Sequence, residues 1–149
     1  MKIGIVCTQG GHLTESLLIM EAYDGHDLFI ATHPSMRDED LKKIALTYFY
    51  PVFTSNPFKM LGVFIWALRV MLKEKPQMLV SFGAEIAIPY FFWGKLFGVK
   101  LMYIECCARV YDISITGKML YPIVDEFLVQ WPQLLKVAGP KAKYRGGVL

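Results

Sequence analysis

Short apolar runs rich in Val, Ile and Leu alternate along this sequence with segments of helical periodicity. Such alternation is typical of a parallel sheet whose two faces are covered by helices. We therefore predict an α/β fold, a Rossmann-like doubly wound parallel sheet, formed by a single domain over residues 1–149. Strands are expected at residues 2–7, 27–32, 48–53, 78–82, 100–105 and 126–130. Helices are expected at residues 13–22, 58–75, 86–97 and 117–121, with a polar loop at 33–40.

Composition limits the class of protein. Apolar residues make up 54% of the 149 residues and charged residues 19%, against roughly 45–50% and about 25% in typical soluble domains. This excess excludes intrinsic disorder and indicates that part of the surface faces something other than water. The formal net charge is only +3, without a run of Lys and Arg, so no nucleic-acid partner is expected.

The cysteines and the N-terminus bear on location. Cys7, Cys106 and Cys107 have no zinc-ligand spacing, so we expect reduced thiols in a reducing compartment, with no metal and no cofactor. Met1 and Lys2 lead directly into the first predicted strand, so no signal peptide is expected. The longest apolar stretch, residues 60–72, is interrupted by a charge and is too short to span a bilayer. We expect a chain that can lie on a membrane without crossing it.

Three loops follow the carboxyl ends of predicted strands, where ligands bind in sheets of this kind. They contain Gly10, Gly11 and His12 after the first strand, the segment 81–83 after the fourth, and the segment 105–109 after the fifth. Glycines allow close backbone approach to a ligand, and a helix N-terminus favours anions. The first loop is neither the dinucleotide fingerprint nor a Walker motif, so NAD and ATP are disfavoured.

Two side chains on these loops can carry chemistry, and each has a structural alternative. His12 is a candidate acid/base group or a hydrogen-bond donor to phosphate, or it is only a solvent-facing residue of a tight turn. Glu105 is a candidate base, or it pairs with Arg109 to brace the loop. A polar turn follows that either binds phosphate or caps the next helix; it contains Ser114, Thr116 and Lys118.

The predicted helix 58–75 is apolar over most of its circumference. At 100° per residue, Lys59, Trp66, Arg69 and Lys73 fall on one stripe. Such a helix can lie in a membrane interface with its cations toward anionic headgroups, or it can be a core helix. A second aromatic and basic cluster, which includes Phe92 and Trp93, strengthens the membrane interpretation.

The segment from Tyr103 onward resembles the family of asparagine-linked glycosylation protein fourteen. The matching residues are Ile104, Glu105, Ala108, Arg109, Val110, Ser114, Thr116, Gly117, Lys118, Asp125, Phe127, Val129, Gln130, Trp131, Tyr144 and Gly146. The glycine loop before His12 and the segment 81–89 match as well. Cys106 stands where the family usually has Ser, and the loop that begins at Ser81 departs from the usual pattern. The start at the first strand, without a membrane anchor, is similar to prokaryotic members.

This resemblance implies the N-terminal, acceptor half of a split GT-B glycosyltransferase. Such a subunit is membrane-associated, lies peripherally at the cytoplasmic face, and extends a polyprenyl- or dolichyl-pyrophosphate-linked sugar. A partner subunit, the second GT-B half, binds the UDP-sugar, for which UDP-N-acetylglucosamine is favoured. The resemblance implies His12 and Glu105 as catalytic residues. It implies acceptor or phosphate binding by Gly10, Gly11, Ser81, Gly83, Arg109, Ser114, Thr116 and Lys118.

Other functions remain open. The chain can instead be a non-catalytic scaffold that recruits a soluble glycosyltransferase to the membrane. A nucleotide-binding Rossmann domain is disfavoured because Thr32 and His33, rather than an acidic residue, follow the second strand. The apolar end formed by Val148 and Leu149 is expected to dock the partner, or alternatively to cover the chain's own core.

Overall fold

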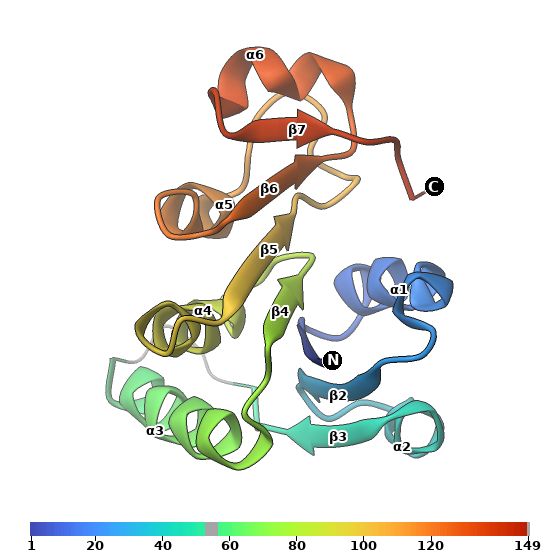
Figure 1. The fold of residues 1–149 in the computed structure, drawn as a ribbon, viewed down its shortest axis with the longest axis vertical. Helices are drawn as coiled ribbons and strands as arrows, with labels where there is room; N and C mark the ends of the chain where they lie inside the picture. The colour runs from blue at the N-terminus through green and yellow to red at the C-terminus, as the bar shows by residue number, and fades with distance from the viewer. Residues whose placement is uncertain (53–56, 149) are drawn as a thin grey trace.

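The computed structural model describes residues 1–52 and 57–148, except for the side chains of residues 57 and 58 (Figure 1). Seven parallel strands form one sheet in the order β3-β2-β1-β4-β5-β6-β7. The strands are β1 (Lys2–Val6), β2 (Asp27–Thr32), β3 (Leu46–Phe49), β4 (Met78–Ser81), β5 (Lys100–Ile104), β6 (Glu126–Val129) and β7 (Ala142–Tyr144). The helices are α1 (Gly11–Leu18), α2 (Asp38–Ile44), α3 (Pro57–Glu74), α4 (Ala87–Leu96), α5 (Ile115–Leu120) and α6 (Leu135–Ala138). Two 3-10 turns, η1 (Met20–Tyr23) and η2 (Pro132–Leu134), complete the described elements.

Helices cover both faces of the sheet, as the sequence predicts. Figure 1 shows α3, α4 and α5 on one side and α1 and α2 on the other. Side chains alternate between the faces along each strand, so Val6 and Leu79 pack under α3 and α4, whereas Ile5 and Val80 pack under α1 and α2. The doubly wound prediction is confirmed.

Close packing at the centre of the sheet requires a glycine in β1. A Cβ atom at Gly4 would run into the side chains of Phe29 and Leu79. The small residue therefore lets large side chains from both neighbouring strands pack closely over β1.

Several parts of the secondary-structure prediction are wrong. The third strand covers Leu46–Phe49 and does not continue through residues 50–52 as expected. Residues 38–44 form α2 rather than part of a loop; it is short, with only Leu41 buried, so its apolar pattern is weak. The strand at 126–130 is the last one that the sequence predicts, but the chain adds β7 at the edge of the sheet. This strand has three residues, is mostly exposed and lacks an apolar run. The first helix ends at Leu18 and is followed by η1 rather than continuing to residue 22.

Candidate active site

A cleft of about 580 Å³ opens at the carboxyl edge of the sheet. The cleft lies next to β1, whose neighbours in the sheet are β2 on one side and β4 on the other. The chain changes direction across the sheet at this point, and α/β sheets bind ligands at such a switch point. The residues that line it are Thr8, Gln9, His12, His33, Val52, Ala84, Glu85, Tyr103, Glu105, Cys106, Ala108, Arg109, Ser114, Ile115 and Thr116. The structure thus brings together His12, Glu105, Arg109, Ser114 and Thr116.

Several predicted phosphate-binding residues lie outside this lining. Ser81 is buried, and its Oγ accepts a hydrogen bond of 3.0 Å from the amide of Gly83. Lys118 lies on the exposed side of α5, where its Nζ pairs with Asp112 at 3.0 Å. Gly10, with a φ of 89°, and Gly11 are exposed next to the cleft but do not line it. These residues are therefore not among those that line the cleft, and their phosphate contacts stay a prediction.

His12 lies in the first turn of α1 and packs against Gly83. A Cβ atom at Gly83 would lie 3.3 Å from Cε1 of His12 and 3.2 Å from the Tyr103 hydroxyl. Gly83 also has a φ of 121°, a conformation that other residues rarely adopt. Its function in this structure is to leave room for the imidazole. Among the described residues, Nδ1 of His12 is buried without a hydrogen-bond partner.

Glu105 is fully buried at the end of β5 and holds the following loop. Its carboxylate accepts hydrogen bonds from the Ser114 amide at 2.9 Å, the Ser114 hydroxyl at 3.1 Å and the Cys106 amide at 3.2 Å. No ion pair with Arg109 occurs in the described part of the chain, so the predicted brace is made by Ser114 instead. Burial raises the pKa of Glu105, and the hydrogen bonds from Ser114 and Cys106 oppose this shift only in part.

Ser114 connects Glu105 to α5. Its Oγ accepts a hydrogen bond of 2.9 Å from the amide of Gly117 and so caps the helix, while the Tyr103 hydroxyl lies 2.9 Å away. A Cβ atom at Gly117 would lie 2.5 Å from the Glu105 carboxylate, which explains the small residue there. Of the two alternatives for the polar turn, Ser114 therefore fits the one in which it caps the next helix, α5.

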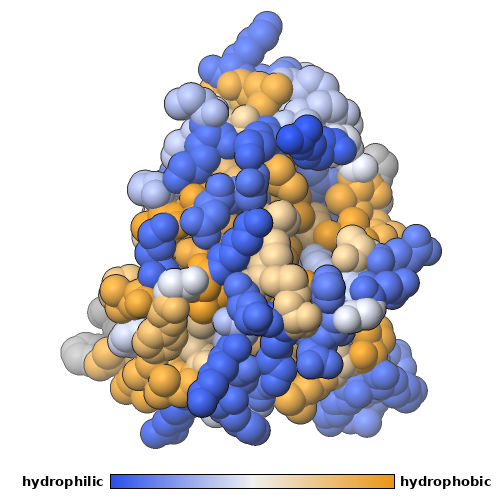
Figure 2. Space-filling view, in the orientation of Figure 1, coloured by the Kyte–Doolittle hydropathy of each residue, from blue (hydrophilic) through white to orange (hydrophobic). Residues whose placement is uncertain are grey.

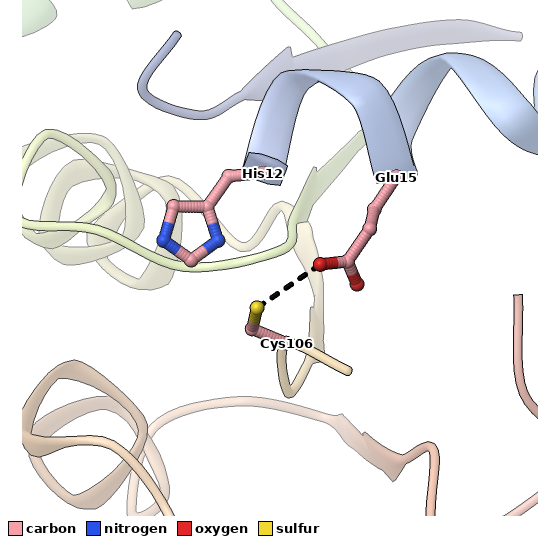
Figure 3. A group of neighbouring side chains, drawn as sticks. All are labelled: His12, Glu15 and Cys106. Atoms are coloured by element: carbon pink, nitrogen blue, oxygen red, sulfur yellow. Dashed lines mark hydrogen bonds between the residues drawn. The ribbon is translucent and has the colours of Figure 1, made fainter. Parts of the chain in front are cut away.

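A second buried carboxylate, Glu15, was not among the predicted site residues. It accepts hydrogen bonds from the Cys106 thiol at 3.0 Å, the Cys107 amide at 3.1 Å and the Gln130 side-chain amide. Its position one helical turn after His12 is the sequence signal that could have identified it. Figure 3 shows His12, Glu15 and Cys106 turned toward one another.

The cations predicted to bind a membrane are exposed, whereas Trp66 is half-buried. Lys59, Arg69 and Lys73 lie on the outer surface of α3. Trp66 faces the sheet, with its ring centroid 6.0 Å from that of Tyr50, and its indole nitrogen is buried. Its ring lies 6.5 Å from that of Tyr48, over which the Lys73 ammonium lies at 5.2 Å. Trp66 is therefore half-buried beside the cations, and its membrane contact stays a prediction.

Apolar side chains accompany these cations on the outer surface of α3 and α4. We call this set the α3/α4 face; its exposed apolar members are Leu61, Ile65, Leu72, Phe92, Leu96 and Phe97. Figure 2 shows hydrophobic residues interspersed with hydrophilic ones over the lower left of the molecule, where Figure 1 places these helices. Trp93 is half-buried and donates a hydrogen bond of 2.9 Å to the Phe64 carbonyl, which ties the two helices together. Within the described residues, no helix is both long enough and apolar enough to span a bilayer.

The C-terminal segment folds back on the domain. Val148 packs against the core on the α1 side of the sheet, and its amide donates a hydrogen bond of 2.9 Å to the Gln130 side chain. This placement corresponds to the alternative in which the tail covers the chain's own core. Leu149 lies outside the described residues.

The chain matches a known protein family. The family described as "Oligosaccharide biosynthesis protein Alg14 like" matches residues 50–148. This range includes Glu105, Arg109 and α3 but not His12.

Individual relatives agree with this match. The UDP-N-acetylglucosamine transferase subunit ALG14 of Kluyveromyces lactis is 36% identical over 90 residues, which cover 56% of this chain and 38% of that protein. The subunit of the same name from Mus musculus is 25% identical over 182 aligned residues, covering 100% of this chain and 83% of that protein. This chain thus spans less than half the length of the first of these relatives.

The fold is also that of one half of a larger protein. Acinetobacter baumannii MurG superposes with a TM-score of 0.80 at 19% identity, over 99% of this chain and 45% of that chain. The seven-stranded sheet therefore matches one half of a GT-B glycosyltransferase.

Proposed function

Because the chain belongs to the family of Alg14-like oligosaccharide biosynthesis proteins, we propose that it is the acceptor-binding subunit of a UDP-N-acetylglucosamine transferase. Its acceptor would be a sugar on a polyprenyl- or dolichyl-pyrophosphate carrier at the cytoplasmic face of a membrane. A second subunit would bind the UDP-sugar and close over the cleft. The observation that carries the proposal is the cleft at the sheet's switch point, on a fold that matches one half of a two-domain transferase.

The cleft offers suitable groups for an anionic acceptor. Arg109 is exposed at the rim of the cleft. Among the described residues, no carboxylate forms an ion pair with its guanidinium. An unpaired guanidinium suits the pyrophosphate of the lipid carrier, because its planar donors match phosphate oxygens. Thr116 lines the same cleft, and a threonine hydroxyl can donate to a sugar or phosphate oxygen.

His12 is the better-placed base of the two candidates. In the proposed step the acceptor hydroxyl loses its proton to the imidazole while its oxygen bonds to the anomeric carbon of the UDP-sugar. The bond from that carbon to the phosphate oxygen breaks, and UDP leaves with the electron pair. Glu105 is fully buried and both its oxygens already accept hydrogen bonds, so we assign it to positioning the loop 106–114.

The α3/α4 face supports a peripheral membrane location. Exposed aliphatic and aromatic side chains lie beside Lys59, Arg69 and Lys73. This combination is what an interfacial surface requires, since apolar side chains enter the acyl boundary and cations meet anionic headgroups. Binding of the α3/α4 face to a membrane would bring the cleft close to the lipid-linked acceptor.

Reconstitution tests this function. The purified chain alone, the candidate donor-binding subunit alone, and the two together would be given UDP-N-acetylglucosamine and a polyprenyl-pyrophosphate-linked sugar. We expect transfer only from the mixture. Transfer by this chain alone would contradict the half-enzyme proposal. Equal transfer by the partner alone on detergent-dispersed acceptor would favour the recruitment-scaffold alternative.

A further inference from the structure

We propose that His12, Glu15 and Cys106 form a binding site for a zinc-type divalent cation at the base of the cleft. One ligand atom from each residue can be chosen so that all three lie within 4.8 Å of one another. Figure 3 shows the three side chains converging from α1 and from the loop after β5. The group is a mixture of nitrogen, oxygen and sulfur donors, which Zn²⁺ prefers and which Mg²⁺ and Ca²⁺ do not.

The distances need only small adjustments. With Zn–N near 2.0 Å and Zn–S near 2.3 Å, the ligand atoms of a tetrahedral zinc ion are roughly 3–4 Å apart. The Cys106 sulfur and a Glu15 oxygen are already 3.0 Å apart. A shift of about 1 Å at the end of the imidazole would complete a set of three ligands.

Two features of the isolated cluster indicate that something can be added to it. Nδ1 of His12 is a buried atom without a hydrogen-bond partner among the described residues, and it is the ring nitrogen turned toward Glu15 and Cys106 (Figure 3). The Glu15 carboxyl is buried and held by uncharged donors, and no ion pair involves it within residues 1–52 and 57–148. A cation would satisfy the nitrogen and compensate the buried carboxylate at the same time.

The site has the form of an open rather than a closed metal centre. Three protein ligands leave one tetrahedral position, as in zinc sites that bind water or another small ligand. His12 and Cys106 line the cleft, so the remaining position would face it. Gln130 supports the ligands, since its side-chain amide donates to Glu15 and to the Glu105 carbonyl at 3.1 Å.

Binding displaces a proton. The Cys106 thiol donates its hydrogen to Glu15, and a cysteine binds zinc only as the thiolate. Coordination forms the metal–thiolate bond and releases the thiol proton to solvent, with no change in oxidation state. Binding should therefore weaken as the pH is lowered.

Metal binding to the full chain tests the site without relying on transfer activity. Zn²⁺ would be titrated calorimetrically in two buffers of different ionisation enthalpy, and Co²⁺ would be followed by its thiolate charge-transfer absorption. We expect one ion per chain and net proton release. Cys106→Ser should abolish the charge-transfer band, and His12→Gln and Glu15→Gln should each weaken Zn²⁺ binding at least about tenfold.

Matched variants make the result decisive. Cys107→Ser replaces the neighbouring thiol and His26→Gln an exposed imidazole, and both should bind Zn²⁺ within twofold of wild type. Absence of saturable binding to folded wild-type protein would overturn the proposal, as would binding that survives Cys106→Ser or depends on Cys107. Melting curves without metal would establish that each variant is folded.

A consequence for transfer rests on the proposed function. A metal on Nδ1 keeps the proton on the other ring nitrogen, so His12 could donate a hydrogen bond but could not accept a proton. Zn²⁺ should then inhibit transfer by the two-subunit complex, and Cys106→Ser should be at least about tenfold less sensitive. Zinc binding without any transfer would reject the proposed function alone, and transfer without zinc binding would reject the cation site alone.

Discussion

His12 and Glu105 line the same cleft, but their surroundings give them different chemistry. The imidazole of His12 is partly exposed and has one ring nitrogen without a described partner. The carboxylate of Glu105 is fully buried and occupied by Ser114 and Cys106. One residue is thus free to react, whereas the other holds the loop in place.

At the residue scale, the first prediction concerns His12, the proposed base. His12→Ala should lower transfer by the two-subunit complex at least about 100-fold, the usual contribution of a general base, without changing the melting temperature by more than a few degrees. His26→Ala, at an exposed position remote from the cleft lining, is the control. Activity within a few-fold of wild type would remove His12 from the chemistry.

Glu105→Gln should act mainly on stability. The amide cannot accept all the hydrogen bonds that the carboxylate accepts from Ser114 and Cys106, and leaving a buried donor unpaired costs about 1–3 kcal/mol. Thermal melting should show the loss, and Glu85→Gln at the exposed rim should not. An unchanged melting temperature combined with a loss of transfer as large as that of His12→Ala would instead make Glu105 the base.

At the scale of elements, one buried carboxylate joins the end of α3 to the sheet. Glu74 accepts hydrogen bonds from the Lys2 ammonium at 2.7 Å and from the Tyr48 hydroxyl. Burial raises the pKa of Glu74, but the hydrogen bonds from Lys2 and Tyr48 outweigh it, so the net pKa lies below its ordinary value. The contact therefore ties α3 to β1 and β3.

This shift predicts a dependence of stability on pH. Because the folded-state pKa is depressed, the contribution of Glu74 is present above the unfolded value of about 4.3 and is lost as the pH falls through the folded value. Denaturant unfolding between pH 7 and pH 3 should show a shallower decline for Glu74→Gln than for wild type. Glu39→Gln, in an exposed pair on α2, should follow the wild-type curve. Parallel curves for Glu74→Gln and wild type would contradict the assignment.

At the scale of the whole molecule, the cleft and the α3/α4 face are two separate surfaces of the domain. The cleft is at the carboxyl edge, and the face is formed by helices that cover one side. Under the proposed function, seating of the α3/α4 face on a membrane would leave the cleft open to the partner subunit and to a lipid-linked sugar.

This arrangement predicts binding to anionic vesicles. Each cation near an anionic surface contributes about 1 kcal/mol, so reversing Lys59, Arg69 and Lys73 to Glu should release the chain in a sedimentation assay. Added salt should weaken wild-type binding. The same charge change at Lys42, Lys43 and Lys136, exposed on α2 and α6, should have a smaller effect. Equal loss from both triple variants would indicate that net charge alone drives the binding.

The sequence by itself determined the alternation of strands and helices and the edge of the sheet where the site lies. Both follow from local patterns, because a buried strand is a short apolar run in the sequence. Gly10 lies in the loop after β1, and Glu105 directly follows β5. It failed at α2 and β7, because elements of seven and three residues with few buried side chains carry too weak a pattern. The tertiary structure decided the rest. How deeply Trp66 is buried and whether Glu15 meets Cys106 and Gln130 depend on packing between segments far apart in the chain. No local periodicity encodes such contacts.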